Sequence, residues 1–294
     1  MQLIINQVVA GSIPACHHQS NTLENLNTIG MSMSFISKLK IGLREPRLVV
    51  RFVNRRLLGK KHQEIALEDV CTYLDIERKE AIRRASIKDT PEESALWEAK
   101  NRTTKTHYRD YYSKNIHYIE RQDWYNRFPD LGFCKIIPSN GKVMDYGCGT
   151  AHVILQAAKK RKDLDIHLAD IPEAMTKNYA IYRFKKHVIS VTWWDIPENE
   201  QLIGVKGNFD FIRCHDVFEH TFHPDVVMNT FIAMLKQGGV LSFDFIEDDG
   251  DYSKEKTKES MMLREKVLQT VRENFQIIKE SAGFNQNSWL VRKL

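Results

Sequence analysis

The chain has 294 residues, of which 42% are apolar, and a chain of this size and composition can bury a substantial core. Its net charge of +5 is small for the length, so composition alone does not require a nucleic-acid partner. The five cysteines show neither C-x-x-C nor zinc-site spacing, and no apolar run approaches membrane-spanning length, so we expect a reduced, cytoplasmic protein without a metal site.

The first part of the chain differs in composition from the rest. Residues 1–32 mix small and polar residues without a sustained period, which is typical of a poorly ordered leader. The segment 38–61 carries nine Lys or Arg against the single acid Glu45. It predicts a basic, helical segment, broken or begun at Pro46, whose charges either face solvent or contact an anionic surface.

A pair of short helices follows the basic segment. Ala66, Val70 and Leu74 recur at four-residue spacing, and Asp75 can cap a second helix that carries Ala81. Two short helices joined tightly also occur in DNA-binding proteins, but the usual glycine in the turn is absent. We therefore interpret residues 33–130 as a helical N-terminal region that covers the next domain.

An aromatic-rich stretch lies between His107 and Phe128. Such a density is typical of core and interdomain packing, and a lid over a substrate pocket uses the same residue types. If the stretch is a lid, Tyr111 and Tyr112 are its leading substrate contacts, and only one of the two can face the pocket squarely on a helix.

From Gly141 onward, short apolar runs alternate with helical stretches, which is the pattern of parallel βαβ units in an α/β fold. We expect strands at 142–146, 165–169, 188–191, 209–213, 240–245, 276–279 and 288–291, and helices at 151–160, 172–184, 224–235 and 255–274.

The first predicted strand ends at Asp145 and runs through a glycine turn into a helix. Glycines let the backbone turn sharply and approach a ligand closely, and the helix that follows offers free N–H groups. A dinucleotide-binding fingerprint needs Gly or Ala three places after Gly149, where this chain has His152. The pattern therefore disfavours a dehydrogenase.

The run D-x-G-x-G-T-A at residues 145–151 resembles motif I of class I S-adenosylmethionine (SAM)-dependent methyltransferases, with Ala151 in place of the frequent third glycine. The resemblance implies that SAM is the cofactor and that Asp145 and the backbone of Gly147, Cys148 and Gly149 hold its methionine moiety. Asp170, beside Ile171, ends the second strand, at the spacing where an acid binds the ribose hydroxyls. Trp194 and Asp195 match the position that covers and binds adenine.

Residues 209–220 resemble the fourth strand and following loop of ubiquinone-biosynthesis-type methyltransferases, with Pro224 and the turn at 235–239 completing the likeness. A C-terminal hairpin around Gly283 implies the antiparallel seventh strand of that family. The resemblance covers about residues 135–294 and implies a Rossmann-like, seven-stranded methyltransferase sheet with the helical N-terminal region added to it.

Methyl transfer needs a base only if the acceptor must lose a proton. His220 and Glu219, just beyond the fourth strand, are the candidate catalytic residues, and His215, also at the cofactor edge, comes next. The alternative is that Glu219 and His220 cap or pack the following helix.

The acceptor is expected to be a small molecule or a glycan, because the N-terminal half carries no motif for nucleic acid or protein tails. Two alternatives stay open: a nucleic-acid-binding protein or RNA methyltransferase that uses segment 38–61, and a SAM-binding scaffold without activity. The sequence does not indicate an oligomeric state.

Overall fold

The computed structural model describes residues 67–86, 118–125, 131–202, 209–246, 256–281 and 288–294, all within one compact unit, Gln63–Leu294. The predicted leader 1–32, the basic segment 38–61 and the predicted contacts Tyr111 and Tyr112 lie outside the described residues. Among the helices that are described, none is both long and apolar enough to cross a membrane.

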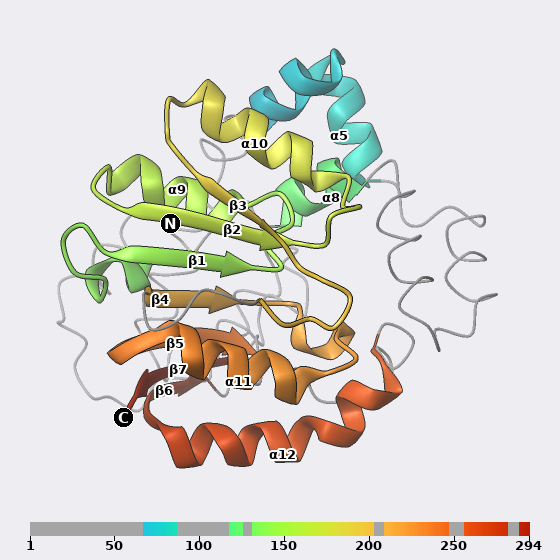
Figure 1. Cartoon of the computed structure of the whole chain (residues 1–294). Coiled ribbons are helices and arrows are strands. Elements are labelled where there is room, and N and C mark those ends of the chain that lie inside the picture. Colours follow the sequence, from blue (N-terminus) through green and yellow to red (C-terminus); the bar gives the residue numbers. More distant parts are fainter. Residues whose placement is uncertain (1–66, 87–117, 126–130, 203–208, 247–255, 282–287) are drawn as a thin grey trace, which may run out of the picture. The chain divides into compact units, whose positions relative to one another are not determined.

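A seven-stranded sheet in the order β3-β2-β1-β4-β5-β7-β6 forms the centre of the described unit (Figure 1). Strands β1 to β5 pair in parallel, and β7 pairs antiparallel with both β5 and β6. The predicted seven-stranded methyltransferase sheet, including the inserted antiparallel strand, is therefore confirmed. The strands are β1 Lys142–Tyr146, β2 Asp165–Asp170, β3 Thr192–Asp195, β4 Phe209–Cys214, β5 Leu235–Asp244, β6 Phe275–Ser281 and β7 Ser288–Lys293.

Helices cover both faces of the sheet, which explains why the parallel strands are apolar on both sides (Figure 1). Helices α11, Pro224–Met234, and α12, Lys258–Asn274, contribute Phe231 and Val271 to one core layer. Helices α9, His152–Lys160, and α10, Thr176–Lys186, contribute Leu155 and Phe184 to the other. Short 3₁₀ turns lie at η1, Gly132–Lys135, and η2, Phe218–His220.

The strand order reverses between β1 and β4, with β2 on one side and β5 on the other. Loops that leave the carboxyl ends of β1 and β4 diverge at such a switch point and leave a crevice between them, which is where ligands bind in open α/β sheets. The glycine turn after β1 and the His215 loop after β4 both open onto this place.

The N-terminal helices pack on α10. Residues 67–74 are helical, followed by α5, Arg78–Ser86, and α8, Tyr118–Tyr125. Val70, Ala81 and Ile119 are buried in a cluster with Tyr179 of α10. The predicted helix pair is present, and its apolar faces are buried in packing. Asp75 lies in the connecting turn with a φ of 51°, so α5 begins three residues later than its predicted cap.

The third strand was predicted wrongly at 188–191, because it begins at Thr192. Val188 has a φ of 54° and is 92% exposed, and the N–H of Ile189 donates to the carbonyl of Phe184 at 3.0 Å. The apolar run that looked like a strand is the turn that ends α10. The fifth strand also starts at Leu235, earlier than the predicted Val240.

Candidate active site

The turn after β1 is built from residues with left-handed backbone. Gly147 and Gly149 have φ values of 66° and 52°, and Ala151, at the start of α9, has a φ of 52°. A β-carbon on Gly147 would collide with the side chain of Val217, and one on Gly149 would collide with Gln122 of α8. The backbone conformation favours glycine at both positions, and lack of space also requires it at Gly147, because the Gln122 side chain is flexible and Val217 is not.

Asp145 is 1% exposed at the end of β1 and lies opposite Arg213 in the register of β1 and β4. Nη1 of Arg213 donates to Oδ1 of Asp145 at 3.0 Å. Among the described residues, Oδ2 of Asp145 has no hydrogen-bond partner, although the residue lines a cavity. Burial raises the pKa of this carboxyl, and the charge of Arg213 opposes that rise.

Asp170 connects the end of β2 to the glycine turn. Its Oδ2 accepts the N–H of Gly149 and its Oδ1 accepts the N–H of Ile171, both at 2.8 Å. Burial raises the pKa of Asp170 to about 6, although both backbone hydrogen bonds act in the other direction. This carboxyl is therefore fixed in place and can change its charge near neutral pH.

Trp194 and Asp195 belong to β3 and are not among the residues that line the cavity. Nε1 of Trp194 donates to Nδ1 of His167 at 2.8 Å, and the Asp195 carboxylate pairs with Lys177 at 2.6 Å. Nε1 of Trp193 also donates to Oδ1 of Asp195, at 2.8 Å. The cavity is lined instead by the next three residues, Ile196, Pro197 and Glu198.

The loop after β4 holds the predicted catalytic residues in different settings. His215 lines the cavity with both ring nitrogens engaged, Nδ1 with Oδ2 of Asp244 at 2.9 Å and Nε2 with Oγ of Ser242 at 2.8 Å. His220 also lines the cavity. Glu219 is 2% exposed and is not among the lining residues, and burial, with the charge of Asp244, raises its pKa well above the usual range.

One cavity brings these parts together at the switch point of the sheet, with about 1160 Å³ of empty space that is partly open to solvent. It is lined by Asp145, the turn from Gly147 to Gly149, Asp170, Ile171, His215 and His220. Tyr118 and Gln122 of α8 also line it, and Nε2 of Gln122 donates to the Tyr118 hydroxyl at 2.7 Å. Neither residue was predicted as a substrate contact, although both fall within the aromatic stretch from His107 to Phe128, for which packing and a lid were the two interpretations.

A family model described as a methyltransferase domain matches residues 133–285, which is more than half of the chain. The chain belongs to this methyltransferase family. The matched residues form a SAM-dependent methyltransferase domain. The match agrees with the resemblance to methyltransferase motif I at residues 145–151, and with the sequence analysis, which disfavoured a dehydrogenase.

Two curated relatives are ubiquinone biosynthesis O-methyltransferases. The methyltransferase is 27% identical over 105 residues to that of Acinetobacter baylyi, which is 36% of this chain and 43% of the relative. It is 28% identical over 102 residues to that of Bordetella avium, which is 35% of this chain and 41% of the relative. The chain thus spans less than half the length of these relatives.

Solved structures with a similar fold include a SAM-dependent methyltransferase from Aquifex aeolicus, with a TM-score of 0.41, 15% identity, and coverage of 56% of this chain and 93% of that one. A putative sarcosine dimethylglycine methyltransferase from Galdieria sulphuraria gives a TM-score of 0.38 and 16% identity over 51% of this chain and 58% of that one.

The cavity residues of the methyltransferase fit SAM in three respects. The orphaned, buried Oδ2 of Asp145 suits a cationic amino group, because a buried carboxylate oxygen without a partner is costly. The turn at Gly147 brings backbone close to a ligand without a β-carbon in the way. The Asp170 carboxylate can accept hydrogen bonds from a pair of hydroxyls.

The affinity for S-adenosylhomocysteine should depend on pH through Asp170. If Asp170 binds the ribose, the hydroxyls would donate to the ionised carboxylate and the ligand would favour the deprotonated form, so affinity should rise with pH until the pH exceeds about 6. Below that pH, affinity should fall by up to about tenfold per unit. Calorimetric titration from pH 5 to 8 measures this, and Asp170→Asn should bind more weakly with a flat profile. An equally steep profile in Asp170→Asn would assign the dependence to another group.

Proposed function

We propose that this methyltransferase methylates a hydroxyl oxygen of a small molecule or glycan. The observation that carries the proposal is the position of His220, which lines the same cavity as the cofactor-fitting residues. The relatives named for ubiquinone biosynthesis are O-methyltransferases, which supports oxygen as the methylated atom. The partly open cavity suits a compact acceptor better than an extended polymer.

Asp145 and the turn from Gly147 to Gly149 would hold the methionine moiety, Asp170 the ribose, and Ile171 with Ile196 the two faces of the adenine. When bound, SAM supplies an electrophilic methyl carbon, which the acceptor oxygen takes as the sulfonium becomes a thioether. The protein aligns the acceptor and keeps water out. Tyr118 and Gln122 of α8 form part of the wall that does this, in line with a lid role for the N-terminal region.

His220 would accept the proton that the acceptor hydroxyl loses. Of the predicted catalytic residues, Glu219 does not line the cavity, and His215 has both ring nitrogens held by Asp244 and Ser242. His215 is therefore better suited to lining the cavity in a fixed orientation than to accepting a proton from the acceptor. Glu219 has no direct access to a substrate in the cavity.

Changing His220 to Gln should lower kcat about 10²- to 10⁴-fold, the usual contribution of a general base, and leave the affinity for S-adenosylhomocysteine nearly unchanged. His223→Gln is the matched control, because His223 is exposed and lies outside the cavity lining. Single-turnover rates of the two variants make the comparison. Equal rates in His220→Gln and wild type would mean that the acceptor needs no base here.

The acceptor class is tested by measuring release of S-adenosylhomocysteine with four groups of compounds: phenols and catechols, aliphatic alcohols, sugar glycosides, and short RNAs. We expect turnover with a hydroxylated small molecule or a glycan. Turnover with RNA alone would overturn the proposal in favour of an RNA methyltransferase. Binding of S-adenosylhomocysteine without turnover of any group would favour a scaffold.

A further inference from the structure

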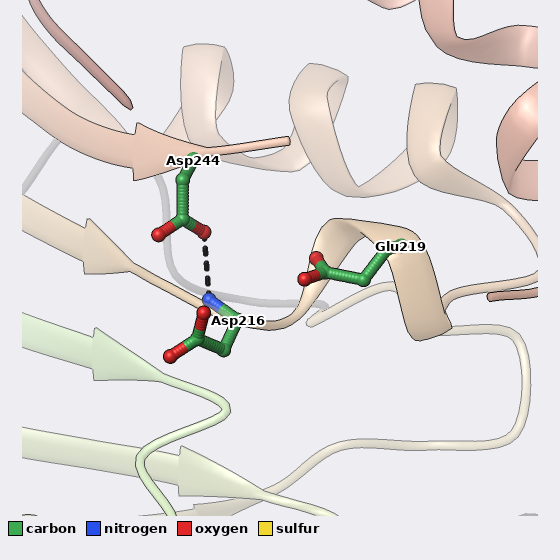
Figure 2. A group of neighbouring side chains, drawn as sticks. All are labelled: Asp216, Glu219 and Asp244. Carbon is green, nitrogen blue, oxygen red and sulfur yellow. Dashed lines mark hydrogen bonds between the residues drawn. The ribbon is translucent and has the colours of Figure 1, made fainter. Parts of the chain in front are cut away.

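Three carboxylates meet beside the cavity, behind the loop that carries His220. Asp216 follows β4, Glu219 lies in η2, and Asp244 ends β5. One oxygen from each lies within 4.8 Å of the other two. Figure 2 shows the carboxylate of Glu219 turned toward the other two residues. Glu219 and Asp244 are 2% and 4% exposed, whereas Asp216 is exposed and lines the cavity.

The hydrogen bonds in this cluster leave one oxygen without a partner. Asp244 accepts from Nδ1 of His215 at 2.9 Å and from the N–H of Asp216 at 2.7 Å, the bond drawn in Figure 2. Oε2 of Glu219 has no hydrogen-bond partner among the described residues. A buried carboxylate oxygen next to a second carboxylate is expensive unless a cation or a proton compensates it.

Among the described residues, Arg213 and Lys256 carry charges that act on the cluster, and neither donates to Oε2 of Glu219. His215, which pairs with Asp244, lowers the pKa of Asp244 more than Arg213 does. Arg213 is hydrogen-bonded to Asp145 at 3.0 Å, and its charge acts on Asp244. Lys256 is buried, and its charge acts on Glu219 less strongly than burial and Asp244 do. No described side chain therefore donates a hydrogen bond to Oε2 of Glu219.

We propose that Asp216, Glu219 and Asp244 bind a divalent cation of the Mg²⁺ or Mn²⁺ type. An all-oxygen set of ligands suits these hard ions, and no cysteine belongs to the cluster. Oxygens on opposite sides of an octahedral Mg²⁺ site are about 4.2 Å apart, twice the metal–oxygen distance, so small side-chain rotations would close the site.

The expected absence of a metal site rested on Cys and His spacing, which does not detect carboxylates contributed by two strands. Asp216 connects the cation to the cavity, where the remaining coordination positions would be taken by water or by an acceptor oxygen. This role rests on the proposed function: the cation would hold the acceptor hydroxyl and lower its pKa, so that His220 takes its proton more readily.

The site is tested by titrating Mn²⁺ into the cofactor-free protein, followed by electron paramagnetic resonance, with no acceptor present. We expect about one ion per chain and at least about tenfold weaker binding in Glu219→Gln and in Asp216→Asn. The second variant alters an exposed residue, so its fold should be preserved. The control is Asp225→Asn, which removes a surface carboxylate paired with Lys266 and should bind Mn²⁺ as wild type does.

The proposed site would be overturned if the wild-type protein does not bind Mn²⁺. It would also be overturned if Glu219→Gln and Asp216→Asn bind Mn²⁺ as tightly as wild type does. If Mn²⁺ binds as expected but removal with a chelator leaves turnover of a known acceptor unchanged, the role is overturned and the site stands. These outcomes are separate from the acceptor test, because Mn²⁺ binding is measured without turnover.

Discussion

Replacing Gly147 with valine should weaken binding of S-adenosylhomocysteine at least about 100-fold, which corresponds to about 2.7 kcal/mol. The φ of 66° is unfavourable for any residue with a β-carbon and most unfavourable for a β-branched one. The new β-carbon would also collide with Val217, so the turn must move away from its place in the cavity. Calorimetry on the purified variant measures the loss, with circular dichroism as the check of folding.

A paired design separates the collision from the backbone strain at Gly147. Gly147→Ala should bind more weakly than wild type, and adding Val217→Ala should restore part of the affinity, because the collision is removed and the strain stays. Gly238→Ala is the control: Gly238 has a φ of 74° and nothing within 4 Å of the added β-carbon. It should cost about 1 kcal/mol of stability and leave affinity unchanged. Full affinity in folded Gly147→Val would show that this turn does not bind the cofactor.

Replacing Arg183 with methionine should lower the free energy of unfolding by about 3 to 5 kcal/mol. Arg183 is 0% exposed in α10 and donates from Nη1 to Asp123 at 2.9 Å and from Nε to Asp69 at 3.2 Å. Burial acts to raise the pKa of Asp123, and the charge of Arg183, with smaller contributions from His152 and Tyr179, holds it below its usual value. Without Arg183, the buried Asp123 keeps the hydrogen bond from the Tyr179 hydroxyl at 2.6 Å but loses its guanidinium partner.

The control for Arg183 is Arg272→Met. Arg272 pairs with Glu265 at 2.7 Å, but the two side chains are 52% and 74% exposed, so the loss should stay below about 1 kcal/mol. Urea unfolding of both variants gives the comparison. Similar losses in the two variants would mean that the buried network contributes no more than a surface ion pair.

The hydrogen bonds of Arg183 also reach the glycine turn after β1. Nη1 of Arg183 donates to the carbonyl of Thr150 at 3.2 Å, directly after Gly149. The same guanidinium therefore ties the N-terminal helices, through Asp69 and Asp123, to the turn that lines the cavity. We expect a measurable loss of S-adenosylhomocysteine affinity in folded Arg183→Met and none in Arg272→Met.

The strands of the parallel sheet could be predicted where turn residues on both sides of an apolar run left a strand as its one interpretation. Strand β1 was predicted with its observed ends, Lys142 and Tyr146, because the glycine turn and the preceding Gly141 limit it on both sides. The run at 188–191 had two interpretations, strand or helix end, and the left-handed backbone at Val188 that decides between them is not visible in the sequence.

The residues proposed to bind the cofactor could be found from the sequence because they come in short motifs. Asp145, Gly147, Gly149 and Asp170 meet in one cavity as expected from their positions at the ends of β1 and β2. Asp195 was placed by motif alone, and the structure pairs it with Lys177 outside the cavity lining. A motif fixes the position along the chain, whereas the partner of a side chain depends on tertiary contacts.

The opposite wall and the carboxylate cluster were not accessible from the sequence. Gln122 reaches the turn at Gly149 only through the packing of α8. Asp244 meets Asp216 and Glu219 only because β5 lies beside β4 in the sheet. Groups joined by strand pairing across a sheet leave no periodic signal in one sequence.

We propose that the cavity at the ends of β1 and β4 is where this methyltransferase binds SAM. Calorimetric titration of the wild-type protein with S-adenosylhomocysteine and, separately, with NAD tests it most directly. We predict saturable binding of one S-adenosylhomocysteine per chain, lost in Gly147→Val, and no binding of NAD. Binding of NAD with no response to S-adenosylhomocysteine would contradict the account.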